Sequence, residues 1–288
     1  MTTDPRSARA PSSETVDRGL PIGVFDSGVG GLTVLRAIRA ALPHESAVYL
    51  GDTARVPYGT KSRDSVLRYS LQASRQLVER GIKLLVVACN TASALSLPEL
   101  RAELAPLPVL GVVEPGAEAA VAASAAQRHL VLATEATVAQ RAYTRSIRAL
   151  APRAEVEELA CSLFVALAEE GWTDDAVAAA AARAYLGPIA ARPDRERPDS
   201  VILGCTHFPL LADAIRAALG PAPSIVDSAT ATARSVAALL ERDALATSAS
   251  ARGDLRLLVT DGAARFARLG SRFLGETFVV GDVEVVDL

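Results

Sequence analysis

The sequence predicts an α/β fold made of two similar halves, and three observations support this prediction. Short, nearly continuous apolar runs recur along the 288 residues, segments with helical spacing separate them, and two of the runs end in a similar cysteine-containing pattern. Strands that are apolar on both faces are typical of a parallel sheet that helices cover on both sides. The repeated ending indicates that this arrangement occurs twice in the chain.

The predicted strands are seven apolar runs that end near Gly, Asp, Asn or Thr. Between the first two runs, apolar residues spaced from Leu32 to Leu42 share one helical face. A later helix is predicted to begin at Pro209 and to stop at Gly220, because proline suits the first helical position and a Gly-Pro pair stops a helix. The seven runs occupy residues 21–28, 47–53, 84–93, 108–116, 129–137, 200–209 and 224–230.

Composition and charge exclude several classes of protein. The chain has 30 Lys or Arg and 33 Asp or Glu, and the resulting net charge of −3 argues against a nucleic-acid-binding protein. Half of the residues are apolar and 4% are aromatic, which suits a packed core of Ala, Val and Leu. No apolar run approaches the roughly 18 residues that cross a bilayer, so we expect no membrane segment. Residues 1–20 hold no signal sequence or anchor, and we expect a disordered tail there.

The three cysteines, Cys89, Cys161 and Cys205, form no C-x-x-C pair, and their odd number excludes a disulfide framework. The sequence therefore predicts a cytoplasmic protein. Cys161 lies inside the apolar segment ACSLFVAL and is interpreted as a small buried apolar residue. Cys89 and Cys205 differ from it, because each ends an apolar strand at the point where side chains leave the core.

Polar residues follow most of the predicted strands, at the edge where open parallel sheets bind ligands. We expect these residues to converge on one site. Cys89 lies 63 residues after Asp26 and Cys205 lies 71 residues after Thr134, so the two halves have similar spacing. A two-fold relation between them would place the two thiols on opposite sides of a bound ligand. The strand-closing residues are Asp26-Ser27, Asp52-Thr53, Cys89-Asn90-Thr91, Thr134, Thr137 and Cys205-Thr206-His207.

The glycine-rich segment DSGVGG at residues 26–31 has two interpretations. It is not a dinucleotide-binding fingerprint, because Thr33 occupies the position of the third glycine, and it lacks the lysine of a phosphate-binding loop. It is either a tight turn between strand and helix, or a loop whose backbone N–H groups and Ser27 hydroxyl hold a carboxylate.

The chemistry of Cys89 and Cys205 also has alternatives. Zinc binding is poorly supported, since the C-T-H segment lacks the usual ligand spacing. Redox chemistry requires the two halves to close onto each other. Acyl transfer with Cys205 as nucleophile and His207 as base leaves Cys89 unused. Two thiols on opposite faces of one carbon suit inversion of a stereocentre, in which one base removes the α-proton while a conjugate acid delivers another.

Such a thiol needs its pKa lowered from about 8.5 to about 7. We expect helix N-termini after both cysteines to contribute to this change. Asp26 is expected to orient or exchange protons with Cys89, and His207 is expected to do the same for Cys205.

Six sequence blocks resemble the glutamate racemases of the cofactor-independent aspartate/glutamate racemase superfamily. In chain order they are IGVFDSGVGGLTVL, GDTARVPYGTKS, VVACNTASA, GVVEPGA, LGCTHFPLL and VDSA, between about residues 22 and 227. The resemblance implies interconversion of L- and D-glutamate without pyridoxal phosphate, metal or nucleotide, which supplies D-glutamate for peptidoglycan synthesis. It also implies two pseudo-symmetric domains with parallel sheets flanked by helices, and an active site in the cleft between them.

The resemblance further implies roles for individual residues. Cys89 and Cys205 are implied to be the acid/base thiols, Cys89 deprotonating the D-isomer and Cys205 the L-isomer. Asp26 and His207 match auxiliary acid/base groups, and Glu169 aligns with a glutamate near the second thiol. The implied substrate contacts are Asp26, Ser27, Tyr58, Gly59, Asn90, Thr91, Thr134, Thr137, Thr206 and His207.

The expected first domain comprises residues 21–113 and 223–288, and the expected second domain comprises residues 114–222. Segment 191–200, rich in charge and proline, is expected to be an exposed loop. Arg55 and Lys61 are interpreted as solvated loop charges. The resemblance implies a homodimer. Two alternatives stay open: a racemase of the same superfamily that acts on aspartate or a hydantoin, and a catalytically silent relative with a binding or regulatory role.

Overall fold

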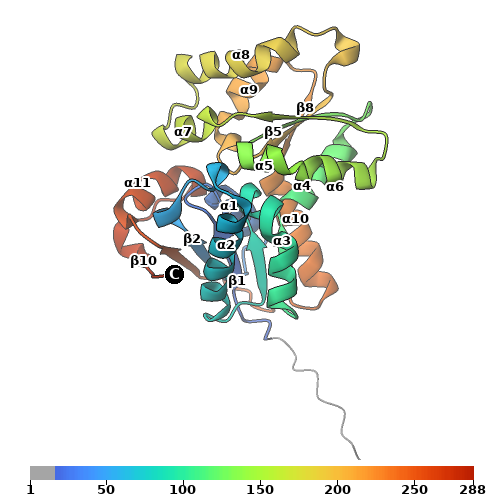
Figure 1. The fold of residues 1–288 in the computed structure, drawn as a ribbon. Helices are drawn as coiled ribbons and strands as arrows, with labels where there is room; N and C mark the ends of the chain where they lie inside the picture. Colours follow the sequence, from blue (N-terminus) through green and yellow to red (C-terminus); the bar gives the residue numbers. More distant parts are fainter. Residues whose placement is uncertain (1–16) are drawn as a thin grey trace, which may run out of the picture.

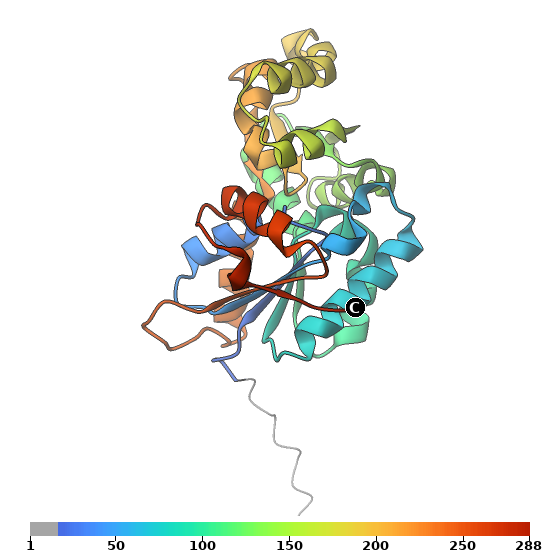
Figure 2. The same ribbon diagram turned by 90° about the vertical axis from the view of Figure 1, so that its left-hand side faces the viewer.

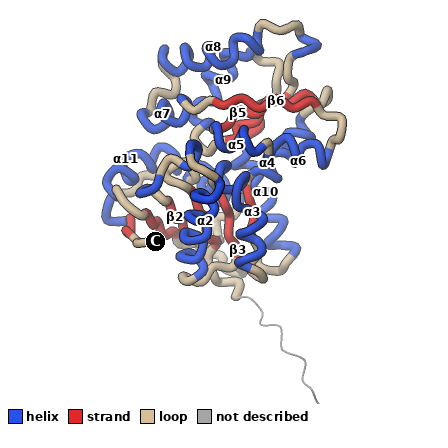
Figure 3. Tube along the Cα trace, viewed as in Figure 1, coloured by secondary structure: helices blue, strands red, loops and turns tan. Residues whose placement is uncertain are grey.

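Two parallel sheets organise the protein in the computed structural model, which describes residues 17–288 (Figure 1). The larger sheet has the strand order β10-β9-β2-β1-β3-β4, and the smaller has the order β6-β5-β7-β8. Figure 3 shows the strands as two separate groups. The larger sheet contains β1 (Ile22–Asp26), β2 (Ala47–Gly51), β3 (Leu84–Val87), β4 (Val109–Gly111), β9 (Leu255–Val259) and β10 (Val283–Val285). The smaller contains β5 (Arg128–Ala133), β6 (Glu155–Ala160), β7 (Ser200–Gly204) and β8 (Ser224–Asp227).

Helices cover both sheets, so that most strand side chains are buried on both faces. Figure 2 shows the second domain stacked on the first, with α11 at the top of the first domain. The helices of the first domain are α1 (Leu32–Ala41), α2 (Arg63–Val78), α3 (Asn90–Leu104), α10 (Ser228–Arg242) and α11 (Ala263–Leu274). Those of the second are α4 (Val113–Ala123), α5 (Glu135–Gln140), α6 (Ala142–Leu150), α7 (Leu163–Glu170), α8 (Ala176–Ala190) and α9 (Ala212–Leu219).

The register of the first sheet explains why its polar strand ends meet. β1 lies between β2 and β3, with Asp26 opposite Gly51 and Phe25 opposite Val87. The three strands therefore end at one edge of the sheet, and Cys89 follows two residues after Val87. This edge faces the second domain.

The second sheet brings its own strand ends together in the same way. β5 lies between β6 and β7, and Ala133 at the end of β5 pairs with Gly204 at the end of β7. Thr134 and Cys205 are the next residues along these two neighbouring strands. The predicted fold class, two α/β halves with parallel sheets, is confirmed.

The strand β8 corrects the expected domain boundary between residues 222 and 223. It pairs with β7, with Leu203 opposite Asp227, so it extends the second sheet and not the first. We propose that the second domain reaches Asp227 and that the chain returns to the first domain with α10.

Each of the seven predicted apolar runs contains a strand, but three further strands lie outside them. β6 was missed because it is an edge strand with Glu155, Glu157 and Glu158, and its side chains are only partly buried. β9 has the sequence LRLLV, in which Arg256 interrupts the apolar residues although the strand lies between β10 and β2. β10 is a short, largely exposed edge strand. Edge strands do not need the continuous apolar pattern of central ones.

The helix after Cys205 and the first described residues also differ in detail from the prediction. The segment after Cys205 begins with a 3₁₀-helix, Phe208–Leu211, and α9 starts only at Ala212, although it ends before Gly220 as expected. Residues 1–16 of the expected disordered tail lie outside the described residues. Residues 17–20 form a turn, and Lys83 Nζ donates a hydrogen bond to the carbonyl of Arg18 (2.6 Å).

Two further expectations concern the exposure of the segment 191–200 and membrane-spanning helices. The segment 191–200 is largely exposed and leads into β7, as predicted. Between residues 17 and 288, no helix is both long and apolar enough to cross a membrane.

Candidate active site

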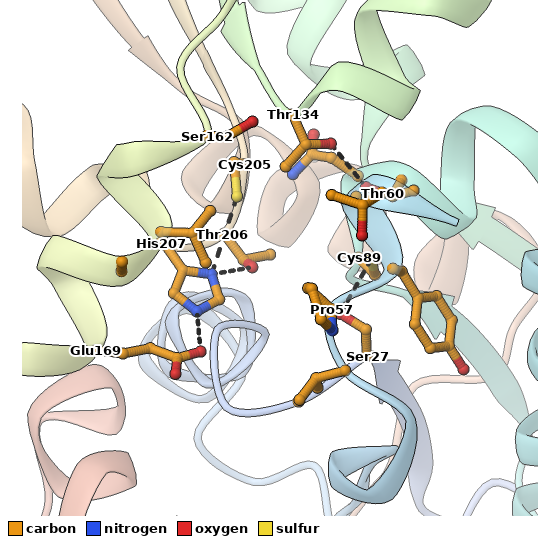
Figure 4. Close-up of a pocket in the computed structure, with 18 residues that line it drawn as sticks. Ser27, Pro57, Thr60, Cys89, Thr134, Ser162, Glu169, Cys205, Thr206 and His207 are labelled. Carbon is orange, nitrogen blue, oxygen red and sulfur yellow. Dashed lines mark hydrogen bonds and ion pairs between the residues drawn. The ribbon is translucent and has the colours of Figure 1, made fainter. Parts of the chain in front are cut away.

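A cavity of about 310 Å³ lies between the two domains, at the carboxyl ends of the strands (Figure 4). Parallel sheets with this topology bind ligands at this edge. Among the described residues, no lysine or arginine lines the cavity. The lining residues from the first domain are Ser27, Gly28, Val56, Pro57, Tyr58, Gly59, Thr60, Cys89, Asn90 and Thr91. Those from the second are Thr134, Ser162, Val165, Ala166, Glu169, Cys205, Thr206 and His207.

Cys89 reaches the cavity from the first domain, as the residue that precedes α3. Its sulfur accepts a hydrogen bond from the backbone N–H of Ala92 (3.4 Å), and its thiol lies 3.5 Å from Ser27 Oγ. Burial and the neighbouring Asp26 raise the pKa of the Cys89 thiol to about 12. The expected lowering by the helix N-terminus is therefore wrong for Cys89, because burial and the nearby carboxyl group outweigh it.

Cys205 reaches the cavity from the second domain, at the end of β7. Its sulfur lies 3.9 Å from His207 Nδ1, and His207 Nε2 lies 3.2 Å from Glu169 Oε1. Figure 4 shows this chain of side chains on the side of the cavity away from Cys89. Only a 3₁₀-helix follows Cys205, so the expected α-helix N-terminus is absent at this thiol.

His207 is held as a cation by its neighbours. Its burial favours the neutral ring, but hydrogen bonds with Cys205 and Glu169 outweigh this effect and raise the pKa of His207 to about 10. The hydrogen bond with His207 is also the main cause that lowers the pKa of Glu169. Arg265 adds to the network by donating to Glu169 Oε2 (2.6 Å). An imidazolium beside Cys205 stabilises negative charge on its sulfur.

Asp26 is buried and is not among the residues that line the cavity. The side chain is completely buried, Oδ2 accepts a hydrogen bond from the Gly28 N–H (2.8 Å), and Oδ1 has no partner among the described residues. Burial raises the pKa of Asp26, and the charge of His207 opposes this. Asp26 thus influences Cys89 through its charge, while direct substrate contact would require a change in its position.

Gly30 of the DSGVGG segment lies at the contact between the domains. A Cβ atom at Gly30 would lie 2.2 Å from Thr206 Oγ1 and 2.5 Å from His207 Nδ1. Thr33 Oγ1, which follows in α1, donates to the Thr206 carbonyl (3.0 Å). Because Gly30 has no side chain, the loop after β7 can approach the turn after β1 closely.

Three threonine hydroxyls form a cluster across the domain boundary. Thr91 Oγ1 lies 3.0 Å from Thr134 Oγ1 and 3.3 Å from Thr137 Oγ1, and the latter two are 3.0 Å apart. Thr91 and Thr134 line the cavity, whereas Thr137 is fully buried behind them. The structure therefore places Thr137 as a support for the other two hydroxyls.

Tyr58 and Gly59 line the cavity, but the Tyr58 hydroxyl is turned to Asp52. Arg55 Nε donates to the same Asp52 carboxylate (2.7 Å), and its guanidinium lies 4.1 Å from the ring centre of Tyr69. The interpretation of Arg55 as a solvated charge is therefore wrong, although it is absent from the cavity wall.

Several residues of the site were not predicted from the sequence. Arg265 lies 96 residues from its partner Glu169, and no local pattern marks it. Tyr143 donates from its hydroxyl to Asn90 Oδ1 (2.7 Å). A buried tyrosine needs such a partner, which is the signal that could have drawn attention to Tyr143.

Metal binding has no support from the part of the chain that the structure describes. No group of three or more His, Cys, Asp or Glu side chains is placed to hold an ion in residues 17–288. Cys161 is buried and lies outside the cavity lining, and burial raises its pKa to about 12.

Comparisons with known proteins agree with this geometry. A family model described as Asp/Glu/Hydantoin racemase matches residues 22–236. A glutamate racemase of Geobacter metallireducens is 51% identical over 268 residues, which cover 93% of this chain and 96% of the relative. A solved glutamate racemase from Thermus thermophilus, in complex with β-chloro-D-alanine, is 44% identical, with a TM-score of 0.83 over 94% of this chain and 98% of the other. A glutamate racemase from Francisella tularensis in complex with D-glutamate is 31% identical, with a TM-score of 0.85 over 93% and 98%.

These matches cover the two α/β domains and the cleft between them. Together, the fold and the family model define the class of the protein as an amino-acid racemase, an isomerase. The chain belongs to the Asp/Glu/hydantoin racemase family.

Proposed function

We propose that the protein interconverts L- and D-glutamate with Cys205 and Cys89 as its two acid/base groups. The observation that carries the proposal is that one thiol from each domain lines the same cavity. Inversion at a carbon requires a proton to leave on one face and another to arrive on the opposite face, and one sulfur on each side meets this requirement.

The surroundings of the two thiols favour complementary proton states. Cys89, with a pKa of about 12, holds its proton, and Cys205 lies beside the His207 cation. In the L-to-D direction, the Cα–H bond breaks as the Cys205 sulfur takes the proton, and Cys89 gives its proton to the other face. The D-to-L direction runs through the same steps in reverse, with Cys89 as the base. Asp26 and His207 are the groups that adjust the charge near each sulfur.

Neutral donors are proposed to hold the dianionic substrate. Ser27, Asn90, Thr91, Thr134 and Thr206 present hydroxyl or amide groups to the cavity. Such donors bind carboxylates well where water is excluded, and they do not form ion pairs with a thiolate. Glutamate as the substrate is supported by relatives named glutamate racemase, and by the structure of one of them in complex with D-glutamate.

The biological role follows from the product. We propose that the protein supplies D-glutamate for peptidoglycan synthesis, that it acts in the cytoplasm, where thiols stay reduced, and that it forms a homodimer. Its three cysteines are free, which supports a reducing compartment.

The test is to give the purified protein L-glutamate in heavy water with no added cofactor. We expect loss of optical activity together with deuterium at the α-carbon. Faster turnover of aspartate or a hydantoin would favour another racemase of the superfamily. The absence of α-proton exchange with every one of these substrates would favour a catalytically silent relative.

A further inference from the structure

Tyr143 and Asn90 form a hydrogen bond that crosses the boundary between the domains. Tyr143 belongs to α6 of the second domain and is completely buried, and Asn90 opens α3 of the first domain. The phenol donates to Asn90 Oδ1 at 2.7 Å. The contact ties the residue that follows Cys89 to the opposite half of the molecule.

The other end of the same amide has no partner. Asn90 lines the cavity and is 3% exposed, and its Nδ2 is buried without a hydrogen-bond acceptor among the described residues. A buried N–H group without an acceptor is costly, so its presence beside a cavity points to an acceptor supplied by the ligand. A substrate carboxylate is such an acceptor.

The Tyr143 ring lies close to the backbone at two glycines, which leave room for it. A Cβ atom at Gly204, the residue before Cys205, would lie 3.1 Å from Tyr143 Cε2. A Cβ atom at Gly116 would lie 3.2 Å from the Tyr143 hydroxyl. Burial raises the pKa of the Tyr143 phenol above its usual range, so the hydroxyl stays a donor at any pH at which the enzyme works.

We propose that Tyr143 is a positioning residue that fixes the orientation of the Asn90 amide, so that Nδ2 donates to a carboxylate of the amino-acid substrate. This inference rests on the proposed function. A flipped amide would oppose its Oδ1 to the substrate carboxylate and lose the hydrogen bond to the substrate, while its NH₂ group could only donate to the phenol oxygen. Since Tyr143 comes from the second domain, Asn90 is correctly oriented only when the two domains are in contact.

The first test is Tyr143→Phe, which keeps the ring and removes only the hydroxyl. We expect the KM for L- and D-glutamate to rise about tenfold, as for loss of one hydrogen bond to a charged group, with kcat changed less than twofold. This pattern indicates loss of binding that is equal in the ground and transition states. The matched control is Tyr185→Phe, which removes a hydroxyl that lies outside the cavity lining and accepts a hydrogen bond from the backbone N–H of Leu163 (3.3 Å). This variant should leave KM unchanged.

The second test is a double-mutant cycle with Asn90→Ala. If Tyr143 acts through Asn90, adding Tyr143→Phe to Asn90→Ala should change KM less than twofold. Independent, multiplying effects would overturn the proposal, as would a lower Tm for Tyr143→Phe with an unchanged KM. Failure of the proposed function is distinguishable, because the wild-type protein would then turn over aspartate or a hydantoin faster than glutamate, or would racemise none of these substrates.

Discussion

The two thiols end equivalent strands, yet their surroundings differ in charge. Cys89 lies at the end of β3 with a serine hydroxyl at 3.5 Å and the buried Asp26 nearby, and its pKa is raised to about 12. Cys205 lies at the end of β7 beside His207, whose pKa is raised to about 10. The first domain thus places the acidic group of Asp26 near Cys89, and the second domain places the cation of His207 near Cys205.

This difference teaches that the similar strand ends and the unlike neighbours of the two thiols serve the same reaction. The related strand ends place one sulfur on each wall of the cavity. The unlike neighbours then place one sulfur near a buried carboxyl group and the other beside a cation. Proton transfer across a carbon needs one acid and one base at the same time, and two thiols in identical surroundings would favour neither arrangement.

The largest expected effect comes from removing either sulfur. Cys89→Ser and Cys205→Ser should each lower racemisation by at least about 10², the low end of the range for loss of a general acid or base. In heavy water, Cys89→Ser should still place deuterium in L-glutamate, because Cys205 remains to exchange the α-proton on its own face. Mass spectrometry after separation of the enantiomers measures both quantities.

Cys161→Ser is the control for this experiment, since Cys161 does not line the cavity. Its activity should stay near that of the wild-type protein. Near-normal racemisation by either active-site variant would show that this thiol is not an acid/base group. The difference between the surroundings of Cys89 and Cys205 would then not explain the reaction.

The second prediction tests the effects of Asp26 and His207 separately, by measuring how fast each thiol is labelled. Asp26→Asn removes the acidic group near Cys89, so the Cys89 pKa should fall and its labelling by iodoacetamide at pH 8 should accelerate. His207→Asn removes the cation near Cys205 and should slow labelling of Cys205. Because the thiolate is the form that reacts with iodoacetamide, the two variants should change the two labelling rates in opposite directions.

The ratio of Cys89 to Cys205 labelling within one protein supplies the control. A variant that merely opens the cleft accelerates both thiols together and leaves the ratio unchanged. Equal changes at the two sulfurs would show that their surroundings do not set their reactivity independently.

How far the sequence predicts this site depends on how local each contact is. Cys89 and Cys205 were found because each directly follows an apolar strand, and parallel strands end at a common edge whatever their partners are. The burial of Asp26 was not predictable, because the strand-end pattern fixes its place along the chain and not its depth. The hydrogen bond between Tyr143 and Asn90 joins residues that are 53 positions apart.

The fold shows the same limit. The run at 224–230 was recognised as a strand, but the sheet it joins is decided by the connection through α9 and by its pairing with β7. β6 escaped recognition because an edge strand needs only one partly buried face, and Glu155 and Glu157 occupy the other. Sequence patterns report burial within an element, whereas sheet membership is a property of the whole chain.

The third prediction tests the charge of His207 through the pH dependence of the free energy of unfolding. The folded-state pKa of His207, about 10, lies above the ordinary value of 6.5. Its contribution to the free energy of unfolding is therefore fully present below pH 6.5 and is lost as pH rises to about 10. Urea unfolding of wild type and His207→Asn across this window should show the wild-type advantage shrinking. Parallel stability curves would mean that folding does not raise the pKa of His207.

The smallest expected effect concerns Arg265, the outermost member of the Cys205 side. It pairs with Glu169 across the domain boundary at 2.6 Å, but its side chain is 56% exposed. Exposed pairs contribute about 0.2–1 kcal/mol, so Arg265→Gln should lower kcat/KM by at most roughly fivefold by loosening Glu169 from His207. Arg268→Gln, an exposed arginine on the same helix, is the matched control and should have no effect.

Salt and thiol labelling distinguish this role from a purely structural one. Screening weakens an exposed pair, so raising the salt to about 1 M should bring the wild-type rate toward that of Arg265→Gln while the variant changes little. The variant should also slow labelling of Cys205 relative to Cys89, because the imidazolium is less firmly held. A loss larger than tenfold would indicate that Arg265 contacts the substrate itself, and an unchanged labelling ratio would confine the influence on Cys205 to His207 and Glu169.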